Sequence, residues 1–395
     1  MPDIHAVAFL RRYASFLLPA VLFLAAMFVL EHLNGRFWLN DFRVYWSAAD
    51  ALLHGQQVYG LPFGESTGFF KYSPFVAMLF VPFALLPFHV ASVVWFWCIA
   101  GATIAVIIRL HRLLLQHIVL GPLARPNLLL VLSLLCVANH VVRELHLGNM
   151  NMMLLLLAVV AYASADQRPR LAGVLLAVLF MVKPYLCILV IPFLVRGHWK
   201  LVGAGVAAGV AMLALPVVFG FSHSFDLHSA WLQSMVQHGD YLTSGNTISS
   251  LLHRTTGVTD TAPLQVGIIA LTMVVATILA WRLRKEGPMS MGNYVLFFGL
   301  LALVPNLVIT DTQHFLLALP LFSFAIHKLA ERRAPIVLVL FIVICILHGA
   351  NSSDLLGGEL SDKVNGWGVL GVANLMLIAL SARIAGRQLN DPRTA

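Results

Sequence analysis

Charged side chains are scarce in this sequence. Of its 395 residues, 11% are Asp, Glu, Lys or Arg, whereas soluble domains carry about 25%. Hydrophobic residues make up 60% of the chain and stand in long runs. These runs are too many and too long to be the buried core strands of a soluble fold. The composition therefore excludes a water-soluble protein and predicts an all-α, polytopic transmembrane helical bundle.

Cysteine pairs and nucleotide-binding motifs are also missing. The four cysteines lie singly inside apolar runs, which excludes a disulfide framework and a cysteine metal site. There is no Walker loop, no dinucleotide fingerprint and no spaced His/Cys cluster, so we expect no metal and no cofactor. The net charge of +8 is scattered in small groups between apolar runs, and such scatter does not predict a nucleic-acid partner.

Apolar runs fill the chain from end to end. One membrane span takes about 20 apolar residues, so the length allows about 11–13 membrane segments and leaves no room for a soluble domain. We expect a single transmembrane domain over residues 1–395. The first run follows two arginines without a small-residue cleavage site, so we expect an uncleaved span. The runs lie near residues 13–30, 73–88, 90–108, 127–142, 148–165, 171–195, 201–220, 263–281, 291–309, 314–327, 335–349 and 367–385.

Basic residues assign the two sides of the membrane. Small basic groups such as Arg11/Arg12 and Arg282/Arg284/Lys285 mark cytoplasmic loops by the positive-inside rule. Two large loops, 31–72 and 221–262, then face the extracytoplasmic side, with shorter pieces at 143–151, 309–313 and 350–366. We expect a multi-pass protein of the cytoplasmic (inner) membrane, with its polar site facing the extracytoplasmic side.

Three segments depart from simple spans. Residues 171–195 lie between two cytoplasmic loops, which predicts two half-length helices meeting at Lys183-Pro184, where proline breaks a helix. One of the two segments within 73–108 is expected to be partial, because two full spans would put Arg109 outside. The 31–72 loop carries a helical pattern from Tyr45 to Leu52, which predicts a helix on the membrane surface.

Two candidate sites stand in or after the first large loop. Asp41 follows the first span among aromatic neighbours, where partial desolvation suits a carboxylate to be a general base. The competing interpretation is a solvated helix N-cap. Lys71 lies where the chain re-enters the membrane and is expected either to hold a lipid phosphate or to snorkel beside aromatic residues.

Further polar groups interrupt later apolar runs. The segment from Arg143 to Asn151 places ionisable and amide side chains between two runs, where polar groups need partners. Arg143 and Glu144 are alternatively a surface ion pair. Lys183 stands alone within 25 apolar residues, which favours a functional role. The outer segments 246–254 and 310–315 bring Arg254 and His314; His314 is expected to orient Asp41, bind phosphate or donate a proton.

The order of these motifs resembles glycosyltransferase family 87, the polyprenol-phosphate-sugar-dependent transferases of the GT-C fold. The resemblance covers most of the chain. The residues that carry it are Asp41, Phe42 and Tyr45 after the first span, Tyr72 and Pro74 at the re-entry, Gly148-Asn149-x-Asn151, Lys183-Pro184, the turn from Arg196 to Lys200, and His314-Phe315. Two departures stand out: the first-loop motif carries one acid, Asp41, where related GT-C families often have two, and Asn149 stands where the family has glutamine.

The resemblance implies a reaction. The donor is a polyprenyl phosphate carrying mannose, or arabinofuranose in some members, and the acceptor is a hydroxyl of an extracytoplasmic glycan or glycolipid. Asp41 would be the general base of an inverting transfer, and His314 matches a histidine of the family's later outer loop. The leaving phosphate needs positive groups, for which Lys183, Arg143, Lys71 and Arg254 are available. The remaining substrate-binding candidates are Tyr45, Tyr72, Asn149, Asn151, Asn246 and Asp311.

Two other function classes stay open at this point. Polar residues at membrane depth also mark transporters, and a flippase of lipid-linked sugars would use Lys183 and Arg143 as pathway residues. A transporter predicts two similar halves, and no such repeat is present in the sequence. A scaffold of a polysaccharide assembly complex would have no reason to keep Asp41 and His314 on one face. The oligomeric state is not given by the sequence.

Overall fold

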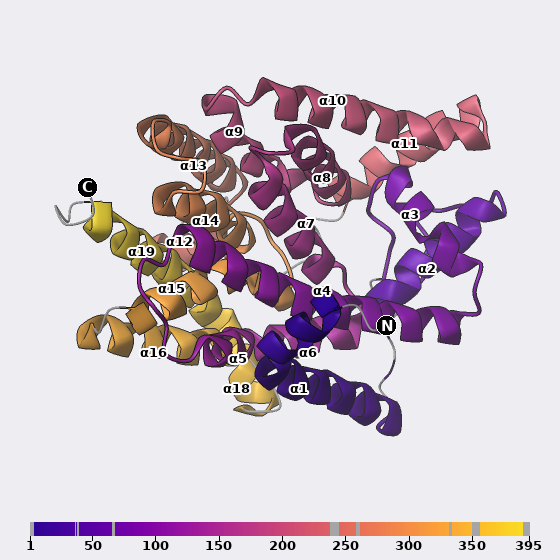
Figure 1. The fold of residues 1–395 in the computed structure, drawn as a ribbon. Coiled ribbons are helices and arrows are strands. Elements are labelled where there is room, and N and C mark those ends of the chain that lie inside the picture. The colour runs from indigo at the N-terminus through magenta and orange to yellow at the C-terminus, as the bar shows by residue number, and fades with distance from the viewer. Residues whose placement is uncertain are drawn as a thin grey trace.

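The computed structural model is helical, as the sequence predicts (Figure 1). It describes residues 4–35, 37, 39–64, 68–237, 245–257, 261–331, 334–349 and 356–389. Within these ranges there is no β-strand, and the one isolated β-bridge joins Pro62 to Phe69.

The first half of the chain supplies the helices around the site. They are α1 (Ile4–Leu33), α2 (Asn40–Leu53), α3 (Pro74–Ala84), α4 (Phe88–His117), α5 (Pro126–Cys136), α6 (Ala138–Leu147), α7 (Asn151–Ser164), α8 (Pro169–Val182), the 3₁₀ helix η1 (Pro184–Val190) and α9 (Ile191–Val195).

The second half packs against these helices. Its elements are α10 (Trp199–Ala214), η2 (Leu215–Phe219), α11 (Phe221–Gln237), α12 (Ile248–Thr256), α13 (Thr261–Leu283), α14 (Met291–Leu307), η4 (Thr312–Ala318), α15 (Leu319–Glu331), α16 (Pro335–Gly349), α18 (Gly358–Trp367) and α19 (Val369–Leu389).

Five helices of the described chain are long and apolar enough to cross a membrane alone. They lie at Arg11–Leu33, Phe88–His117, Trp199–Phe219, Ala262–Leu283 and Val369–Gly386. The pair α5 and α6, bent by 59°, forms a sixth candidate, and six shorter apolar segments of 10–17 residues accompany them. The protein is therefore a multi-pass membrane protein in which many segments are shorter than a full span.

Proline sets where the short segments begin. The helices α3, α5, α8 and η1 each have proline in their first turn, where the missing N–H group is not needed. The chain breaks between α8 and η1 at Lys183, which has an extended backbone. The predicted pair of half-length helices within 171–195 is thus present, and the partial segment within 73–108 is α3, because α4 runs unbroken for 30 residues.

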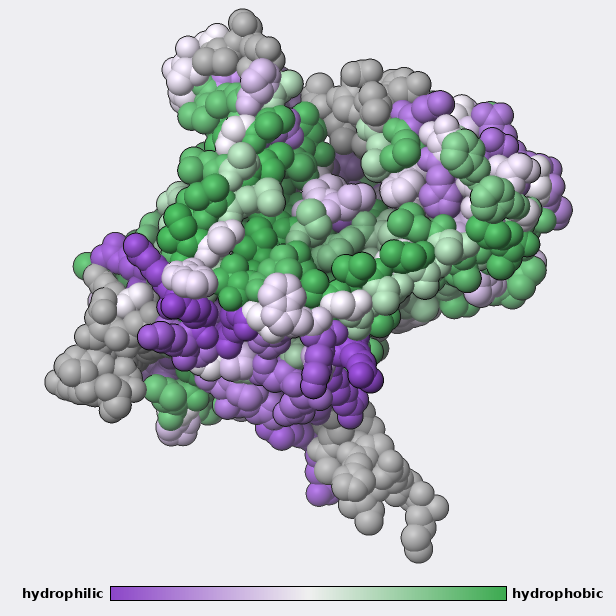
Figure 2. All heavy atoms as spheres, turned by 90° about the horizontal axis from the view of Figure 1, so that it is seen from above, coloured by the Kyte–Doolittle hydropathy of each residue, from purple (hydrophilic) through white to green (hydrophobic). Residues whose placement is uncertain are grey.

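The outward surface of the long helices is apolar. Leu18 of α1, Val206 of α10 and Val266 of α13 are each more than 60% exposed, and such a surface is suited to lipid rather than water. Figure 2 shows apolar residues over much of one face, with a large group of hydrophilic residues at the lower left and a smaller one at the upper right. The exposed apolar area explains why so little charge is needed.

Close packing of small residues joins α8 to α10. A Cβ atom built on Gly173 would stand 2.1 Å from the carbonyl oxygen of Leu201 and 2.8 Å from the nitrogen of Gly205. Glycine at these positions lets two helix backbones approach closely, which is the usual way membrane helices gain packing energy. This contact fixes the position of α8, and with it the break that carries Lys183.

Aromatic packing holds α2 against the bundle. The rings of Phe42 and Trp95 are stacked with centroids 5.6 Å apart, and Trp95 Nε1 donates a hydrogen bond to the Gly148 carbonyl at 2.8 Å. Gly148 has φ +66°, and a Cβ there would lie 2.9 Å from the Cβ of Phe42, so the turn requires glycine. These contacts bring the start of α2 beside the turn between α6 and α7.

Candidate active site

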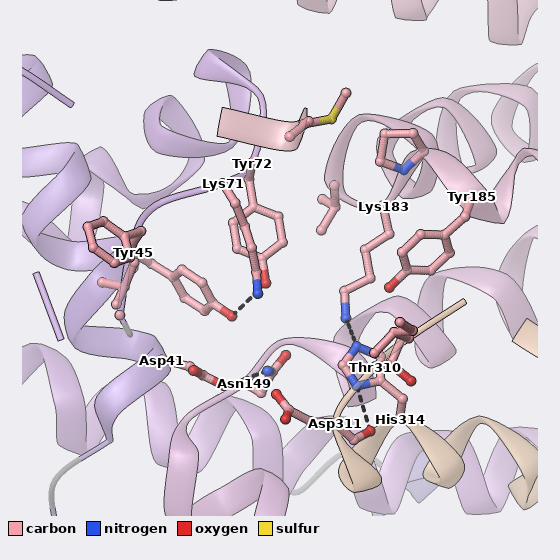
Figure 3. A pocket seen from close by; sticks show the side chains of 17 residues that line it. Asp41, Tyr45, Lys71, Tyr72, Asn149, Lys183, Tyr185, Thr310, Asp311 and His314 are labelled. Carbon is pink, nitrogen blue, oxygen red and sulfur yellow. Dashed lines mark hydrogen bonds between the residues drawn. The ribbon is translucent and has the colours of Figure 1, made fainter. Parts of the chain in front are cut away.

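A cavity of about 430 Å³ opens where α2, the segment before α3, the α8–η1 break and the segment before η4 converge (Figure 3). Its walls combine ionisable and aromatic polar side chains with apolar ones. The lining residues are Asp41, Val44, Tyr45, Gly68, Phe69, Lys71, Tyr72, Asn149, Val182, Lys183, Pro184, Tyr185, Met235, Ile309, Thr310, Asp311 and His314.

Asp41 points into this cavity from the first turn of α2. The residue before the helix is Leu39, in a left-handed conformation with φ 41°, and no side chain caps the helix. The Asp41 carboxylate instead accepts a hydrogen bond from Asn149 Nδ2 at 2.5 Å. Asp41 is therefore committed to a tertiary contact rather than to capping its own helix.

The surroundings of Asp41 favour its neutral form. Burial raises the pKa of Asp41 from 3.8 to about 6, and the nearby charge of Asp311 adds to the rise. The hydrogen bond from Asn149 and the charges of Lys71 and Lys183 act in the opposite direction. A carboxyl group with a pKa near 6 is still ionised at neutral pH and accepts a proton more readily than an ordinary aspartate.

Lys71 also lines the cavity and comes from the segment that leads to α3. Burial lowers the pKa of Lys71, while the charges of Asp41 and Asp311 raise it. Beside it the Tyr45 and Tyr72 hydroxyls are 3.3 Å apart, and Tyr59 donates to the Tyr72 carbonyl at 2.8 Å. These buried aromatic contacts hold the segment of Lys71 in place.

Lys183 enters the cavity from the α8–η1 break. Its ammonium group donates hydrogen bonds to Asn151 Oδ1 and to His314 Nε2, the latter at 2.5 Å. His314 Nδ1 lies 3.1 Å from the Asp311 carbonyl, which can only accept, so the ring proton is on Nδ1 and Nε2 accepts from Lys183. The break frees Lys183 to reach these partners, because its backbone carries the side chain out of the helix.

Glu144 of α6 completes this hydrogen-bond network. The residue is fully buried on α6, and its carboxylate accepts from Asn151 Nδ2 at 2.9 Å and from the Met152 backbone N–H at 3.0 Å. Asn151 therefore links the negative charge of Glu144 to the positive charge of Lys183. A buried charge is costly unless it is bonded and balanced in this way.

A second cavity, of about 660 Å³, adjoins the first. The two share the wall Ile309–Asp311. The residues that line the second cavity are Arg143, Gly245, Asn246, Ser250, His253, Arg254, Ile309, Thr310, Asp311, Thr312, Asp362, Asn365 and Gly366.

The structure distributes the residues predicted from sequence over three places. Lining the first cavity are Asp41, Tyr45, Lys71, Tyr72, Asn149, Lys183, Asp311 and His314. Asn151 lies behind Lys183, and three residues line the second cavity only: Arg143, Asn246 and Arg254. Lys71 and Lys183 are thus separated from Arg143 and Arg254, although all four are candidates for one phosphate.

Some partnerships differ from the expected ones. The amide of Asn149, and not the ring of His314, is the hydrogen-bond partner of Asp41 among the described residues. Arg143 bonds Gln313 at 3.2 Å through Nε instead of pairing with Glu144. Tyr185, directly after Lys183-Pro184, and Thr310, at the start of the candidate segment 310–315, also line the first cavity, although neither was singled out as a substrate-binding residue.

This arrangement provides a proton acceptor and two amines in one enclosed space. A carboxylate beside buried cations suits a reaction in which an alcohol loses its proton while negative charge develops on a leaving group. Within the described ranges, no group of three or more His, Cys, Asp or Glu side chains has the arrangement of a metal site.

Comparisons with known proteins identify relatives of this chain. The chain is 25% identical over 336 residues to the polyprenol-phosphate-mannose-dependent alpha-(1-2)-phosphatidylinositol pentamannoside mannosyltransferase of Mycolicibacterium smegmatis. This alignment covers 82% of this chain and 78% of the relative. No solved structure matches this chain significantly. The model of glycosyltransferase family 87 matches residues 69–305, which include Lys71, Asn149 and Lys183. With more than half of its length matched, this chain belongs to glycosyltransferase family 87.

Proposed function

We propose that this membrane glycosyltransferase transfers mannose from a polyprenyl-phosphate donor to a hydroxyl of an extracytoplasmic glycan or glycolipid, with inversion. The name of the mycobacterial relative supports both the mannosyl donor and a glycolipid acceptor. The protein would act in the cytoplasmic membrane with its site open to the extracytoplasmic side. The basic loops predicted to be cytoplasmic support that orientation.

The observation that carries the proposal is the setting of Asp41. Its carboxylate faces a cavity, is held by Asn149 at 2.5 Å and has a pKa raised to about 6. The side chain is therefore ionised at neutral pH, fixed in orientation and basic enough to take a proton from an attacking alcohol.

The reaction is a single displacement. The acceptor oxygen attacks the anomeric carbon of the donor sugar, and its proton passes to Asp41. The bond between the anomeric carbon and the phosphate oxygen breaks, and its electron pair leaves with the polyprenyl phosphate. Attack from the face opposite the phosphate inverts the anomeric configuration.

Lys71 and Lys183 would stabilise the charge that develops on the leaving phosphate. Both line the same cavity as Asp41 and are near enough to act on its charge. His314 and Asn151 accept hydrogen bonds from Lys183; in this proposal they direct the ammonium group toward the donor phosphate.

The test is sugar transfer by purified protein from radiolabelled polyprenyl-phosphate-mannose to a membrane-glycan extract. Asp41→Asn should lower the transfer rate by about a hundredfold or more, which is the usual contribution of a general base. Asp50→Asn is the matched control, because Asp50 lies on the same helix but outside the cavity. Its rate should equal that of the wild type.

Three other outcomes decide against parts of the proposal. Equal rates for Asp41→Asn and the wild type would exclude Asp41 as the base. Transfer only from a polyprenyl-phosphate pentose would exclude mannose. Movement of intact donor across vesicles without any transfer would replace the transferase by a flippase.

A further inference from the structure

The two adjoining cavities differ in the chemistry of their walls. The first cavity has apolar groups beside its polar ones, including Val44, Phe69, Val182 and Met235. In the second, the sole large apolar side chain among the described lining residues is Ile309. A polyprenyl chain needs apolar surface next to its phosphate, so only the first cavity suits the head of a lipid donor.

Charge is balanced among the described residues that line the second cavity. Arg143 and Arg254 contribute positive charge, whereas Asp311 and Asp362 contribute negative charge. The first cavity is balanced in the same way, by two lysines and two aspartates, so its apolar groups rather than its net charge suit it to a lipid donor. A wall that mixes carboxylates, guanidinium groups, amides and hydroxyls offers both donors and acceptors, which suits a neutral ligand rich in hydroxyl groups.

Two polar atoms on this wall lack a partner. Thr310 Oγ1 and Asn365 Oδ1 are buried and have no hydrogen-bond partner among the described residues. A buried polar atom without a hydrogen-bond partner is unfavourable unless a ligand or water supplies one. Asn365 lines only the second cavity, whereas Thr310 lies on the wall that both cavities share. Asn365 is therefore the residue at which a ligand hydroxyl in the second cavity would supply a missing bond.

The wall is also preformed. Asn306 Nδ2 donates to the Asn246 carbonyl at 2.9 Å, and the Gly371 N–H donates to Asn246 Oδ1 at 3.0 Å. Arg254 Nη2 donates to the Gly245 carbonyl at 2.7 Å. Asn246 is therefore a support that fixes the loop before α12 to α14 and α19. A rigid wall reduces the entropy that is lost on binding.

We propose that the second cavity binds the glycan of the acceptor, while the first cavity binds the sugar phosphate of the donor. The inference rests on the proposed function and assigns its two substrates to separate places. Asp311 lies on the shared wall and in both linings. A glycan in the second cavity would present its terminal hydroxyl past Asp311 to Asp41.

The experiment compares variants of the two cavities. Asp362→Asn and Asn365→Leu alter the second cavity on α18, and Lys71→Gln alters the first. Lys363→Gln is the matched control, because this exposed α18 residue pairs with Glu359 and lines neither cavity. The readouts are the KM for each substrate, with methyl α-mannobioside as acceptor, and release of mannose from the donor to water without acceptor.

Asp362→Asn and Asn365→Leu should each raise the acceptor KM about tenfold, the effect of losing one hydrogen bond of about 1.4 kcal/mol. The donor KM and the rate of mannose release to water should stay within about twofold of the wild type. Lys71→Gln should raise the donor KM and leave the acceptor KM unchanged. Lys363→Gln should change none of these values.

A rise in the donor KM for the α18 variants would overturn the assignment, as would an unchanged acceptor KM in both. Binding of methyl α-mannobioside, followed by saturation-transfer NMR in nanodiscs, tests the cavity without catalysis. Loss of this binding in Asn365→Leu but not in Lys363→Gln would support the glycan site even with a different donor. Absence of any mannose release or transfer by the wild type would contradict the proposed function alone.

Discussion

Asn149 Nδ2 lies 2.5 Å from Asp41 Oδ2, a contact between residues 108 positions apart. It joins the start of α2 to the turn that precedes α7, and Gly148 allows the close approach by its left-handed backbone. The hydrogen bond orients the carboxylate and stabilises its charged form. The hydrogen bond from Asn149 thus lowers the pKa of Asp41 and limits its basicity.

Transfer should depend on pH through Asp41. With its pKa raised to about 6, the carboxylate is protonated below this pH and cannot accept a proton. We expect kcat/KM to be constant above about pH 7 and to fall tenfold for each pH unit below about pH 6. Asn149→Leu removes a hydrogen bond that lowers the pKa, so its acid limb should lie at higher pH. An acid limb unmoved in Asn149→Leu, or one near pH 4, would contradict this assignment.

Lys183→Gln should lower kcat by about a hundredfold or more. Glutamine keeps a hydrogen-bond donor at the break but removes the positive charge proposed to stabilise the leaving phosphate. His314→Gln should cost less, about tenfold, because the ammonium group would remain with Asn151 as a partner. Lys200→Gln, at the exposed start of α10, is the control. Steady-state transfer assays measure these rates, and a larger loss in His314→Gln than in Lys183→Gln would reverse the proposed roles.

Glu144→Gln should lower kcat about tenfold with little change in the donor KM. Glu144 is a positioning residue, since it acts through Asn151 on Lys183, and the amide of glutamine would oppose one of its two donors. If it acts through Lys183, the double variant with Lys183→Gln should be no slower than Lys183→Gln alone. Additive losses in this cycle would show that Glu144 acts by a separate route.

Gly173→Ala should lower the thermal stability of the detergent-solubilised protein. The new Cβ would meet the Leu201 carbonyl at 2.1 Å and force α8 away from α10. Gly203→Ala is the matched control: no atom comes within 4 Å of its added Cβ, and alanine favours a helix by about 1 kcal/mol. We expect a lower Tm for the first and an unchanged or higher Tm for the second. Equal Tm values would show that the α8–α10 contact is adaptable.

Several elements of the fold follow from local sequence. The α8–η1 break is predictable because Pro184 lacks an N–H group and excludes the preceding residue from a helix. The helix α2 is predictable from its pattern, and Tyr45 and Leu52 are buried as that pattern requires. The order of the motifs also identified the family, which the family model matches over residues 69–305.

The sequence alone could not predict which side chains of the site contact one another. Four cationic residues formed one group of phosphate candidates, and only the packing of α6, α8 and α12 separates Lys183 from Arg143 and Arg254. Asn246 likewise stood as a candidate for substrate binding, yet its amide oxygen is bonded by Gly371. Residue type shows that a side chain needs a partner, but the partner depends on contacts between distant segments.

The sequence alone determined that this chain is a multi-pass helical membrane protein, because long apolar runs with few charges are stable only in lipid. It also determined where helices break, since proline acts within one turn of chain. The tertiary structure decided that Asn149 holds Asp41, that Glu144 balances Lys183 and that two cavities meet at Asp311. The physical reason is that hydrogen bonds and charge interactions act over a few ångströms, while the groups that form them are far apart in the sequence.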